Sequence, residues 1–398
     1  MRILVVSAVI PFPPTGGGKL RTFHLTRALA REHEVTLVGF RFDEEPGRSP
    51  FPLRVIEVPY HSPPLFQAME SGDEVAFKAL EAQVPEPWFV SYFDCREMSE
   101  ALHQLATEAF DLVLFEGSDM SRFLPLFGPD SLKVVDFMDV HTRMAQRLVE
   151  TASGGAELKR AQFELGRTRR FEQQIVAHSD LCLACSAIEA DAAKSLLGAC
   201  NIAVIPNGVD TAAFRSDDTM PKSNAILFTG SMDFSPNIEA VKFFVREVFP
   251  AVRKEVPDAV FHIVGANPGP QVKALATTDV VVHGFVPDIG AHYQTASVFV
   301  APILSGGGTR LKILEAAASG RAIVTTSMGL EGLDFTDGQD LLIADTPAAF
   351  ALAVVDLLRN PGQRQQLGFK AAQVSQQYDW ELIGHKLHAV IGQLAVTV

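Results

Sequence analysis

The sequence predicts an α/β protein of two doubly wound domains, each with a parallel sheet covered by helices on both faces. Short runs that are apolar throughout, without polar alternation, are typical of strands buried between two helical layers. Helical or polar stretches separate these runs along the whole chain, and the series begins again after Pro206. The 398 residues also exceed what a single hydrophobic core usually supports.

The expected strands are short runs rich in Val, Ile and Leu. The first half of the chain holds runs at 3–9, 34–40, 54–60, 111–117, 133–138, 180–186 and 202–207. The second half holds runs at 225–231, 259–265, 280–286, 297–303, 322–327 and 340–345.

These two series define the predicted domains. The first domain is expected at 1–206 and the second at 225–378. Residues 207–224 combine turn residues, charges and a Pro without periodicity, which is typical of a linker. Residues 379–398 read as an amphipathic helix that packs back on the first domain. Ligands of doubly wound sheets bind outside the carboxyl ends of the strands, so we expect loops of both domains to form the site.

Composition narrows the class of protein. A formal net charge of −13 and a pI of about 5.3 argue against a nucleic-acid partner. The apolar run at the start is short and ends in Pro, so we interpret it as a strand rather than a signal peptide. No stretch approaches the eighteen apolar residues of a membrane span. These features predict a cytoplasmic protein.

Four cysteines form no dense disulfide framework. Cys182 and Cys185 match a C-x-x-C spacing, but no second Cys or His pair lies nearby in the sequence to complete a zinc site. Buried structural thiols are the better interpretation of this pair. We expect no metal.

The most informative segment follows the apolar run 297–303. It reads SGGGTRLKILEAAASG, a glycine loop that opens a helix carrying Arg310, Lys312 and Glu315. Glycine lets a ligand approach the backbone, and the free N–H groups and positive dipole end of the helix favour an anion. The segment therefore predicts a phosphate cradle, with a simple turn as the alternative. Its loop residues are Ser305, Gly306, Gly307, Gly308 and Thr309.

Two further loops resemble this one. Gly16, Gly17 and Gly18 follow the first predicted strand and open a helix, but they lack the G-x-G-x-x-G spacing that is typical of NAD binding. Gly230 and Ser231 end the first strand of the second domain and are followed by a Pro where the first turn of a helix tolerates it.

Taken together, these motifs resemble family 4 of the retaining glycosyltransferases with the GT-B fold. The resemblance is carried by LKILEAAASGRAIVTTSMGLEGL at 311–333, by HGFVPDIGAHYQTASVFVAP at 283–302 and by VIPNGVD at 204–210. It implies two Rossmann-like domains and a transferase that moves a sugar from a nucleotide diphosphate donor, UDP or GDP, to an acceptor hydroxyl. It also implies retained anomeric configuration, no required metal and no other cofactor. The acceptor would be a sugar, a lipid-linked molecule or another small molecule of polysaccharide or glycolipid synthesis.

The resemblance also implies roles for single residues of the second domain. Glu315 corresponds to the glutamate that accepts hydrogen bonds from the ribose hydroxyls, although an exposed pair with Lys312 is the alternative. The glycine loop would hold the diphosphate, and Lys312 or Arg310 would face the departing phosphate. Phe285 and Val286 match the place where the backbone recognises the base.

In the first domain, the resemblance implies that Gly16 to Gly18 close on the phosphates. His141 stands where many relatives place a His beside the donor sugar, with capping or packing as the alternative role. Asp139 and Glu116 are weaker candidates from the same rim.

The chain also departs from the family pattern. Gly307 stands where many members have a second glutamate, and Ser231 and Asn237 stand where many have Arg and Lys. Arg310 and Lys312 are the nearest substitutes for the missing charge. Two rivals stay open. One is a GT-B nucleotide-sugar epimerase, for which we identify no acid and base residues around the sugar, and the other, motivated by these departures, is a protein that binds a nucleotide sugar without transferring it.

A basic amphipathic helix is expected at 157–180. Its charged residues, Arg167 among them, are expected to face solvent, and three glutamates, including Glu172, reduce its net charge to +2. Such a helix can lie on an anionic membrane, which would suit a lipid-linked acceptor, but an ordinary solvated helix is the alternative.

Overall fold

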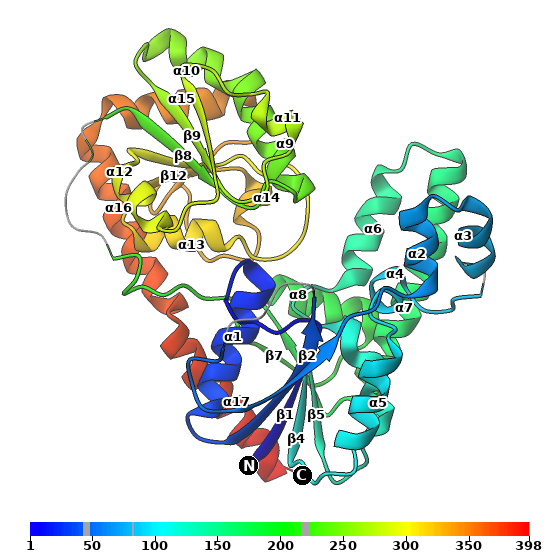
Figure 1. The fold of residues 1–398 in the computed structure, drawn as a ribbon. Coiled ribbons are helices and arrows are strands. Elements are labelled where there is room, and N and C mark those ends of the chain that lie inside the picture. The colour runs from blue at the N-terminus through cyan, green and yellow to red at the C-terminus, as the bar shows by residue number, and fades with distance from the viewer. Residues whose placement is uncertain (43–47, 82, 216–220, 222, 398) are drawn as a thin grey trace. The chain divides into compact units, whose positions relative to one another are not determined.

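The computed structural model describes residues 1–42, 48–81, 83–215, 221 and 223–397, and it divides into two compact units. The first unit is Met1–Pro206 with Gly384–Val398, and the second is Asn207–Ile383. Each unit is an α/β sandwich around one sheet (Figure 1).

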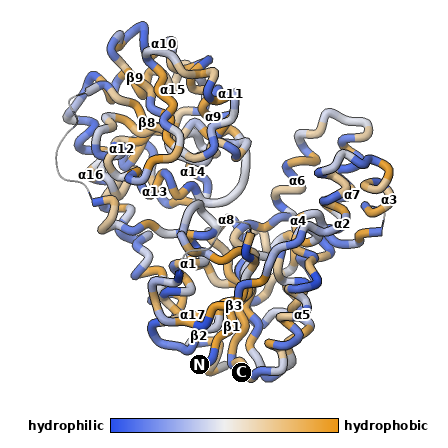
Figure 2. The backbone as a smooth tube through the Cα atoms, viewed as in Figure 1, coloured by the Kyte–Doolittle hydropathy of each residue, from blue (hydrophilic) through white to orange (hydrophobic). Residues whose placement is uncertain are grey.

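The sheet of the first unit is parallel throughout, in the order β3-β2-β1-β4-β5-β6-β7. Every apolar run predicted for the first half overlaps one of its strands, with bounds that differ by a few residues. Burial on both faces explains why the central runs lack polar alternation, and Figure 2 shows hydrophobic colours in the strands beside the β1 label. The strands are β1 (Arg2–Ser7), β2 (Glu34–Arg41), β3 (Arg54–Pro59), β4 (Leu112–Glu116), β5 (Leu132–Asp136), β6 (Leu181–Ala184) and β7 (Ile202–Val204).

Helices connect these strands. A helical insertion stands between β3 and β4, and two long helices, α6 and α7, pair between β5 and β6. The helices are α1 (Gly17–Ala30), α2 (Pro64–Ser71), α3 (Glu74–Glu81), α4 (Trp88–Ser91), α5 (Arg96–Leu105), the 3-10 helix η1 (Ser118–Leu126), α6 (His141–Thr151), α7 (Gly155–His178), α8 (Ala187–Ala192) and the π-helical turn η2 (Ala193–Leu197).

The second unit has a parallel sheet in the order β10-β9-β8-β11-β12-β13. Each apolar run predicted for the second half contains one of these strands. They are β8 (Ala225–Thr229), β9 (Val260–Val264), β10 (Val280–Gly284), β11 (Val298–Ala301), β12 (Ala322–Thr325) and β13 (Leu342–Ile343). The α/β fold class is thereby confirmed.

Helices follow the strands of the second unit in alternation. They are α9 (Ser235–Phe243), the π-helical turn η3 (Phe244–Val248), α10 (Phe249–Glu255), α11 (Pro270–Lys273), α12 (Ile289–Thr295), α13 (Leu311–Ala318), α14 (Ser327–Leu330), α15 (Pro347–Arg359), α16 (Pro361–Ser375) and the 3-10 turn η4 (Gln376–Tyr378). The last helix, α17 (Trp380–Thr397), begins in the second unit and belongs mostly to the first.

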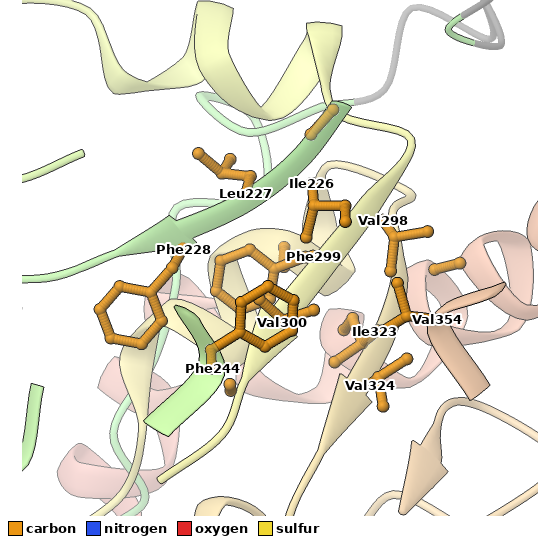
Figure 3. Packing of buried hydrophobic residues seen from close by; sticks show 14 of the residues in the cluster. Ile226, Leu227, Phe228, Phe244, Val298, Phe299, Val300, Ile323, Val324 and Val354 are labelled. Atoms are coloured by element: carbon orange, nitrogen blue, oxygen red, sulfur yellow. The ribbon is translucent and has the colours of Figure 1, made fainter. Parts of the chain in front are cut away.

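The core of the second unit lies between β8, β11 and β12 and the helices over them (Figure 3). Phe244 packs against Phe261 with ring centroids 4.5 Å apart, and both side chains are fully buried. Close packing of rings and branched side chains makes this sheet a rigid platform for the loops at its edge. Phe228 belongs to this core and lies near the carboxyl end of β8, at that edge.

Residues at both ends of the second unit pair with each other. The Val209 N–H donates to Tyr378 O at 2.9 Å, and Thr211 Oγ1 donates to Asp379 Oδ2 at 2.5 Å. This part of the expected linker is therefore bonded to the chain before α17. From Gly384 onward α17 belongs to the first unit, where His388 Nε2 lies 2.9 Å from Ala28 O of α1.

The expected solvent exposure of Arg167 in α7 is wrong. Its guanidinium is 4% exposed and pairs with Glu164 of the same helix. Glu172 is fully buried rather than solvated. Both are among the buried residues of α7, which the charge pattern of the segment alone does not reveal.

Two further observations complete the fold. Cys182 and Cys185 are buried and form no disulfide among the described residues, in agreement with the prediction of buried structural thiols, whereas Cys200 is exposed. None of the helices in the described part of the chain combines the length and hydropathy that crossing a bilayer requires.

Candidate functional site

Arg310, at the end of the glycine loop between β11 and α13, binds backbone carbonyls of that loop. The guanidinium of Arg310 donates to the carbonyls of Gly307 and Ser305, and its side chain is buried. Arg310 is the residue before α13, not a member of the helix as expected. It therefore shapes the loop in this structure instead of projecting toward a ligand.

The loop is also fixed against α9. Ser305 Oγ donates to Glu239 Oε2 at 2.8 Å, and Ser235 Oγ donates to the other oxygen of Glu239 at 2.9 Å. Gly306 has a φ of +97°, and a side chain there would meet Pro236 Cγ at 3.1 Å. Only glycine fits this backbone without strain, so the glycine has a structural reason to be there. The side chain of Thr309 is half-buried beside it.

Lys312 is the cation at the centre of this arrangement. Its Nζ donates to Asn237 Oδ1 at 2.6 Å and lies 4.1 Å from the centroid of the Phe228 ring. Burial lowers the pKa of Lys312 to about 7, with a further lowering by Arg310 and an opposing effect of Glu315. Because burial destabilises the charged ammonium, binding of an anion beside it should stabilise that charge.

The departures from the family pattern at Ser231 and Asn237 surround this lysine. Asn237 Nδ2 donates to Ser231 O at 2.8 Å, so one amide joins the loop after β8 to Lys312. A side chain at Gly230 would lie 2.6 Å from Lys312 Nζ. Glycine at 230 and a neutral amide at 237 thus make room for a lysine that reaches this edge from α13.

Glu315 lies one helical turn below Lys312 and binds a buried tyrosine. Tyr293 donates its hydroxyl to Glu315 Oε2 at 2.8 Å, and Thr229 Oγ1 lies 2.7 Å from the same hydroxyl. Burial raises the pKa of Glu315, while Tyr293 and Lys312 oppose the shift. The alternative of an exposed pair with Lys312 does not describe this carboxylate, which is half-buried and already oriented.

Phe285 and Val286 follow β10 at the same edge of the sheet. The Phe285 ring is 71% exposed, and the Gly265 N–H donates to Gly284 O at 2.9 Å, which joins the ends of β9 and β10. Lys312 stands on the helix that follows β11 of the same parallel sheet, so both segments lie at the carboxyl edge of that sheet.

In the first unit, the three glycines at the start of α1 are open to solvent. Gly16, Gly17 and Gly18 are exposed, and the described residues place no heavy atom within 4 Å of a side chain added at Gly16 or Gly18. Gly16 has a φ of +85° and precedes the 14-residue helix. The start of α1 is therefore uncovered at Gly16 and Gly18 by the residues that the structure describes.

His141 is the first residue of α6 and is held on three sides. Its ring stacks on Phe89 with centroids 3.9 Å apart, and its Nδ1 lies 3.0 Å from Ser118 Oγ and 3.7 Å from Glu172 Oε1. Burial lowers the pKa of His141, but Glu172, Asp119 and Asp139 outweigh it, so the net shift is upward.

Glu172 has a second role at this helix start. Its two oxygens accept the N–H groups of His141 and Thr142, both at 2.9 Å. A carboxylate that caps free N–H groups of a helix is favoured by the dipole as well as by the hydrogen bonds. Burial raises the pKa of Asp119 nearby to about 6, against the opposing effect of His141.

The other two rim candidates differ in position. Asp139 is half-buried in the tight turn before α6, and its N–H lies 2.5 Å from Phe137 O. Glu116 is 1% exposed and stands in register with Asp136, which binds Arg21 through both carboxylate oxygens at 2.5 and 3.0 Å. Burial and Asp136 raise the pKa of Glu116. Glu116 is thus buried beside the Arg21–Asp136 pair that anchors α1, and it does not lie on an exposed rim.

Sequence reasoning missed Tyr293, Glu172 and the role of Asn237 in holding Lys312. Tyr293 reads as an ordinary core residue of a short helix, and Glu172 as one charge among many. Their partners lie 22 and 31 residues away, so no local pattern marks them. Outside these sites, the described residues place His61, Cys95 and Glu97 close enough together to hold a metal ion.

Two family models cover most of the chain. Residues 15–213 match the model described as Glycosyltransferase Family 4, and residues 223–360 match the model described as Glycosyl transferases group 1. This chain belongs to glycosyltransferase family 4.

Curated relatives in the family are distant. An uncharacterised 44.6 kDa protein in the cps region of Klebsiella pneumoniae is 28% identical over 164 residues, which are 39% of this chain and 42% of that protein. The phosphatidyl-myo-inositol mannosyltransferase of Mycobacterium leprae is 28% identical over 205 residues, 48% of this chain and 54% of that protein. These matches span about half the length of the curated relatives.

Solved structures of similar proteins confirm the GT-B fold. The sucrose-phosphate synthase of Thermosynechococcus elongatus aligns over the whole of both chains with a TM-score of 0.73 and 18% identity. HepE of Anabaena, solved in complex with UDP-glucose, aligns over 99% of this chain and all of that chain with a TM-score of 0.67 and 14% identity. Lys312 and Glu315 thus lie on the helix that follows the glycine loop in the second of the two GT-B domains.

Proposed function

We propose that this protein is a retaining glycosyltransferase that moves a sugar from a nucleoside diphosphate sugar to an acceptor hydroxyl. One observation carries the proposal. A partly buried lysine of lowered pKa, Lys312, lies with a pre-oriented carboxylate, Glu315, at the start of a helix behind a glycine loop. The lysine is suited to the developing charge of a leaving diphosphate, and the carboxylate is suited to the diol of a ribose.

The type of transfer that we propose depends on which carboxylates already have hydrogen-bond partners. In the described part of the second unit, Glu315 is bound by Tyr293, and Glu239 is bound by two serines. Neither carboxylate is placed as a nucleophile. We therefore propose front-face transfer, in which the donor phosphate accepts the proton of the attacking hydroxyl while Lys312 stabilises that phosphate. The reaction then needs no metal, and chelation should leave turnover unchanged.

The names of the relatives support a class of substrate. A mannosyltransferase that acts on phosphatidyl-myo-inositol and a protein of a cps region both match this chain in part, and HepE was solved with UDP-glucose. We propose a UDP- or GDP-sugar as donor and a lipid-linked or saccharide acceptor. Lys159 and Arg170 of α7 are exposed, as is Phe163 at 62%, which supports peripheral contact with an anionic membrane where such acceptors lie.

The experiment is a thermal-shift screen followed by product analysis. A nucleotide that binds only the folded protein raises the unfolding midpoint. We expect a shift with one of UDP, GDP, ADP or dTDP and its sugar conjugates, and an NMR-detected product with the anomeric configuration of the donor. An inverted product would overturn retention. A released epimer without acceptor would indicate an epimerase, and donor binding without turnover on any acceptor would indicate a binding protein.

A further inference from the structure

A histidine, a cysteine and a glutamate meet in the first unit, outside the residues assigned to the sugar-transfer site. Cys95 Sγ lies 2.8 Å from Glu97 Oε2, and His61 Nδ1 lies 3.1 Å from Glu97 Oε1. One ligand atom from each side chain lies within 4.8 Å of the other two. The three side chains thus already surround a common point.

The fold brings these residues together from two separate segments. His61 follows β3, the edge strand of the sheet, whereas Cys95 is the residue before α5 and Glu97 belongs to its first turn. Neighbouring tyrosines connect the two segments. Tyr60 donates its hydroxyl to Tyr92 O at 3.0 Å, and the two rings stack with centroids 5.3 Å apart. The arrangement is therefore held by the aromatic packing and does not depend on a ligand.

The donor set indicates which ion fits. Thiolate, imidazole and carboxylate are ligands of zinc, whereas magnesium and calcium prefer oxygen alone. Three protein ligands leave a fourth tetrahedral position for water. Cys95 is 3% exposed, but the side chains of His61 and Glu97 are 64% and 41% exposed, so solvent and ions reach the open side.

We propose that His61, Cys95 and Glu97 bind a zinc ion. On binding, the thiol of Cys95 gives its proton to solvent and its sulfur bonds to the metal, in place of the hydrogen bond to Glu97. The thiolate and the carboxylate then balance the two charges of the ion. Without a metal, the same residues form two separate contacts, a hydrogen bond from the Cys95 thiol to Glu97 and an exposed His61–Glu97 pair. Neither contact by itself requires that all three side chains meet.

Zinc at this place joins the end of β3 to the start of α5. Because the residues lie outside the sugar-transfer site, the ion should stabilise the first unit without serving turnover. The sequence hides the site, since His61 and Cys95 are 34 positions apart and match no zinc-ligand spacing.

The test uses Co²⁺ as a spectroscopic probe on the full chain after metal removal by a chelator. We expect about one equivalent to bind, a thiolate-to-cobalt absorption band, loss of that band on adding Zn²⁺, and a higher unfolding midpoint with Zn²⁺. Cys95→Ala should abolish the band. His61→Ala and Glu97→Gln should each weaken binding at least about tenfold, the loss seen even for residues one layer removed from a metal.

Cys200→Ser is the matched control, because Cys200 is an exposed thiol elsewhere in the unit and should leave binding unchanged. His61→Ala keeps the test valid if Cys95→Ala misfolds, since His61 is an exposed side chain. A band that survives Cys95→Ala, a band that depends on Cys200, or an affinity unchanged by both His61→Ala and Glu97→Gln would overturn the proposal.

Discussion

The two glycine-rich loops of this chain are alike in sequence and different in structure. In the second unit, Arg310 binds the loop carbonyls, Ser305 binds Glu239, and Gly306 lies against Pro236. In the first unit, Gly16 and Gly18 are exposed, with no described heavy atom near a side chain added to either. Three glycines in a row therefore do not tell a built loop from an open one. We expect affinity for a free nucleotide to reside in the second-unit loop.

The largest effect should come from Lys312→Met. Removing the cation beside the leaving phosphate should lower turnover by about 10²- to 10³-fold, as for loss of one pre-oriented donor at a developing charge. Steady-state rates with the donor identified by the thermal-shift screen measure it. Lys273→Met, an exposed lysine of α11, is the matched control and should keep the rate of the unaltered protein. Equal rates in the two variants would show that Lys312 does not take part in the transfer reaction.

A smaller loss, about 10- to 100-fold in turnover, is expected for Glu172→Gln in the first unit. The amide no longer carries the charge that raises the pKa of His141, so the pH profile of turnover should also move to lower pH. A merely structural role would lower stability without moving the profile. Glu157→Gln, at an exposed position of the same helix, should change neither.

Nucleotide affinity should fall as the pH rises above about 7. Burial holds the pKa of Lys312 at about 7, and a diphosphate favours its charged form, so binding takes up a proton above that pH. The slope is at most tenfold per pH unit for one proton. Isothermal titration calorimetry between pH 6 and 9, a range of roughly three units around that pKa, measures it. If Lys312→Met kept the slope of the unaltered protein, the lysine would not be its source.

The two loops should also differ in their tolerance of a methyl group. Gly306→Ala should lower the free energy of unfolding by about 1–3 kcal/mol, because of the positive φ and the contact with Pro236. Gly18→Ala should be neutral or stabilising by at most about 1 kcal/mol, since alanine is the better helix former and has room there. Denaturant titration compares them, and equal losses would contradict the distinction between a built and an open loop.

The strands could be predicted because burial on both faces leaves a continuous apolar run, which needs no knowledge of the neighbours. Lys312 and Glu315 could be located because they share one helix with the glycine loop. What holds them could not be predicted. The bond from Asn237 to Lys312 spans 75 positions, and the bond from Tyr293 to Glu315 depends on how α12 packs under α13. Arg310 was misjudged for a different reason, since its partners are only three and five positions away but the direction of its side chain depends on the backbone of the loop.

The central claim is that the second unit binds a nucleoside diphosphate through the site built around Lys312 and Glu315. Calorimetric titration of the full chain with UDP and GDP, beside Glu315→Gln, tests it most directly. Glu255→Gln serves as control, because Glu255 is exposed on α10 and pairs with Arg359. We predict that one nucleotide binds the unaltered and control proteins equally and Glu315→Gln at least about tenfold more weakly, the loss expected when a charged hydrogen-bond acceptor is removed. Binding that is the same in all three proteins would contradict the account.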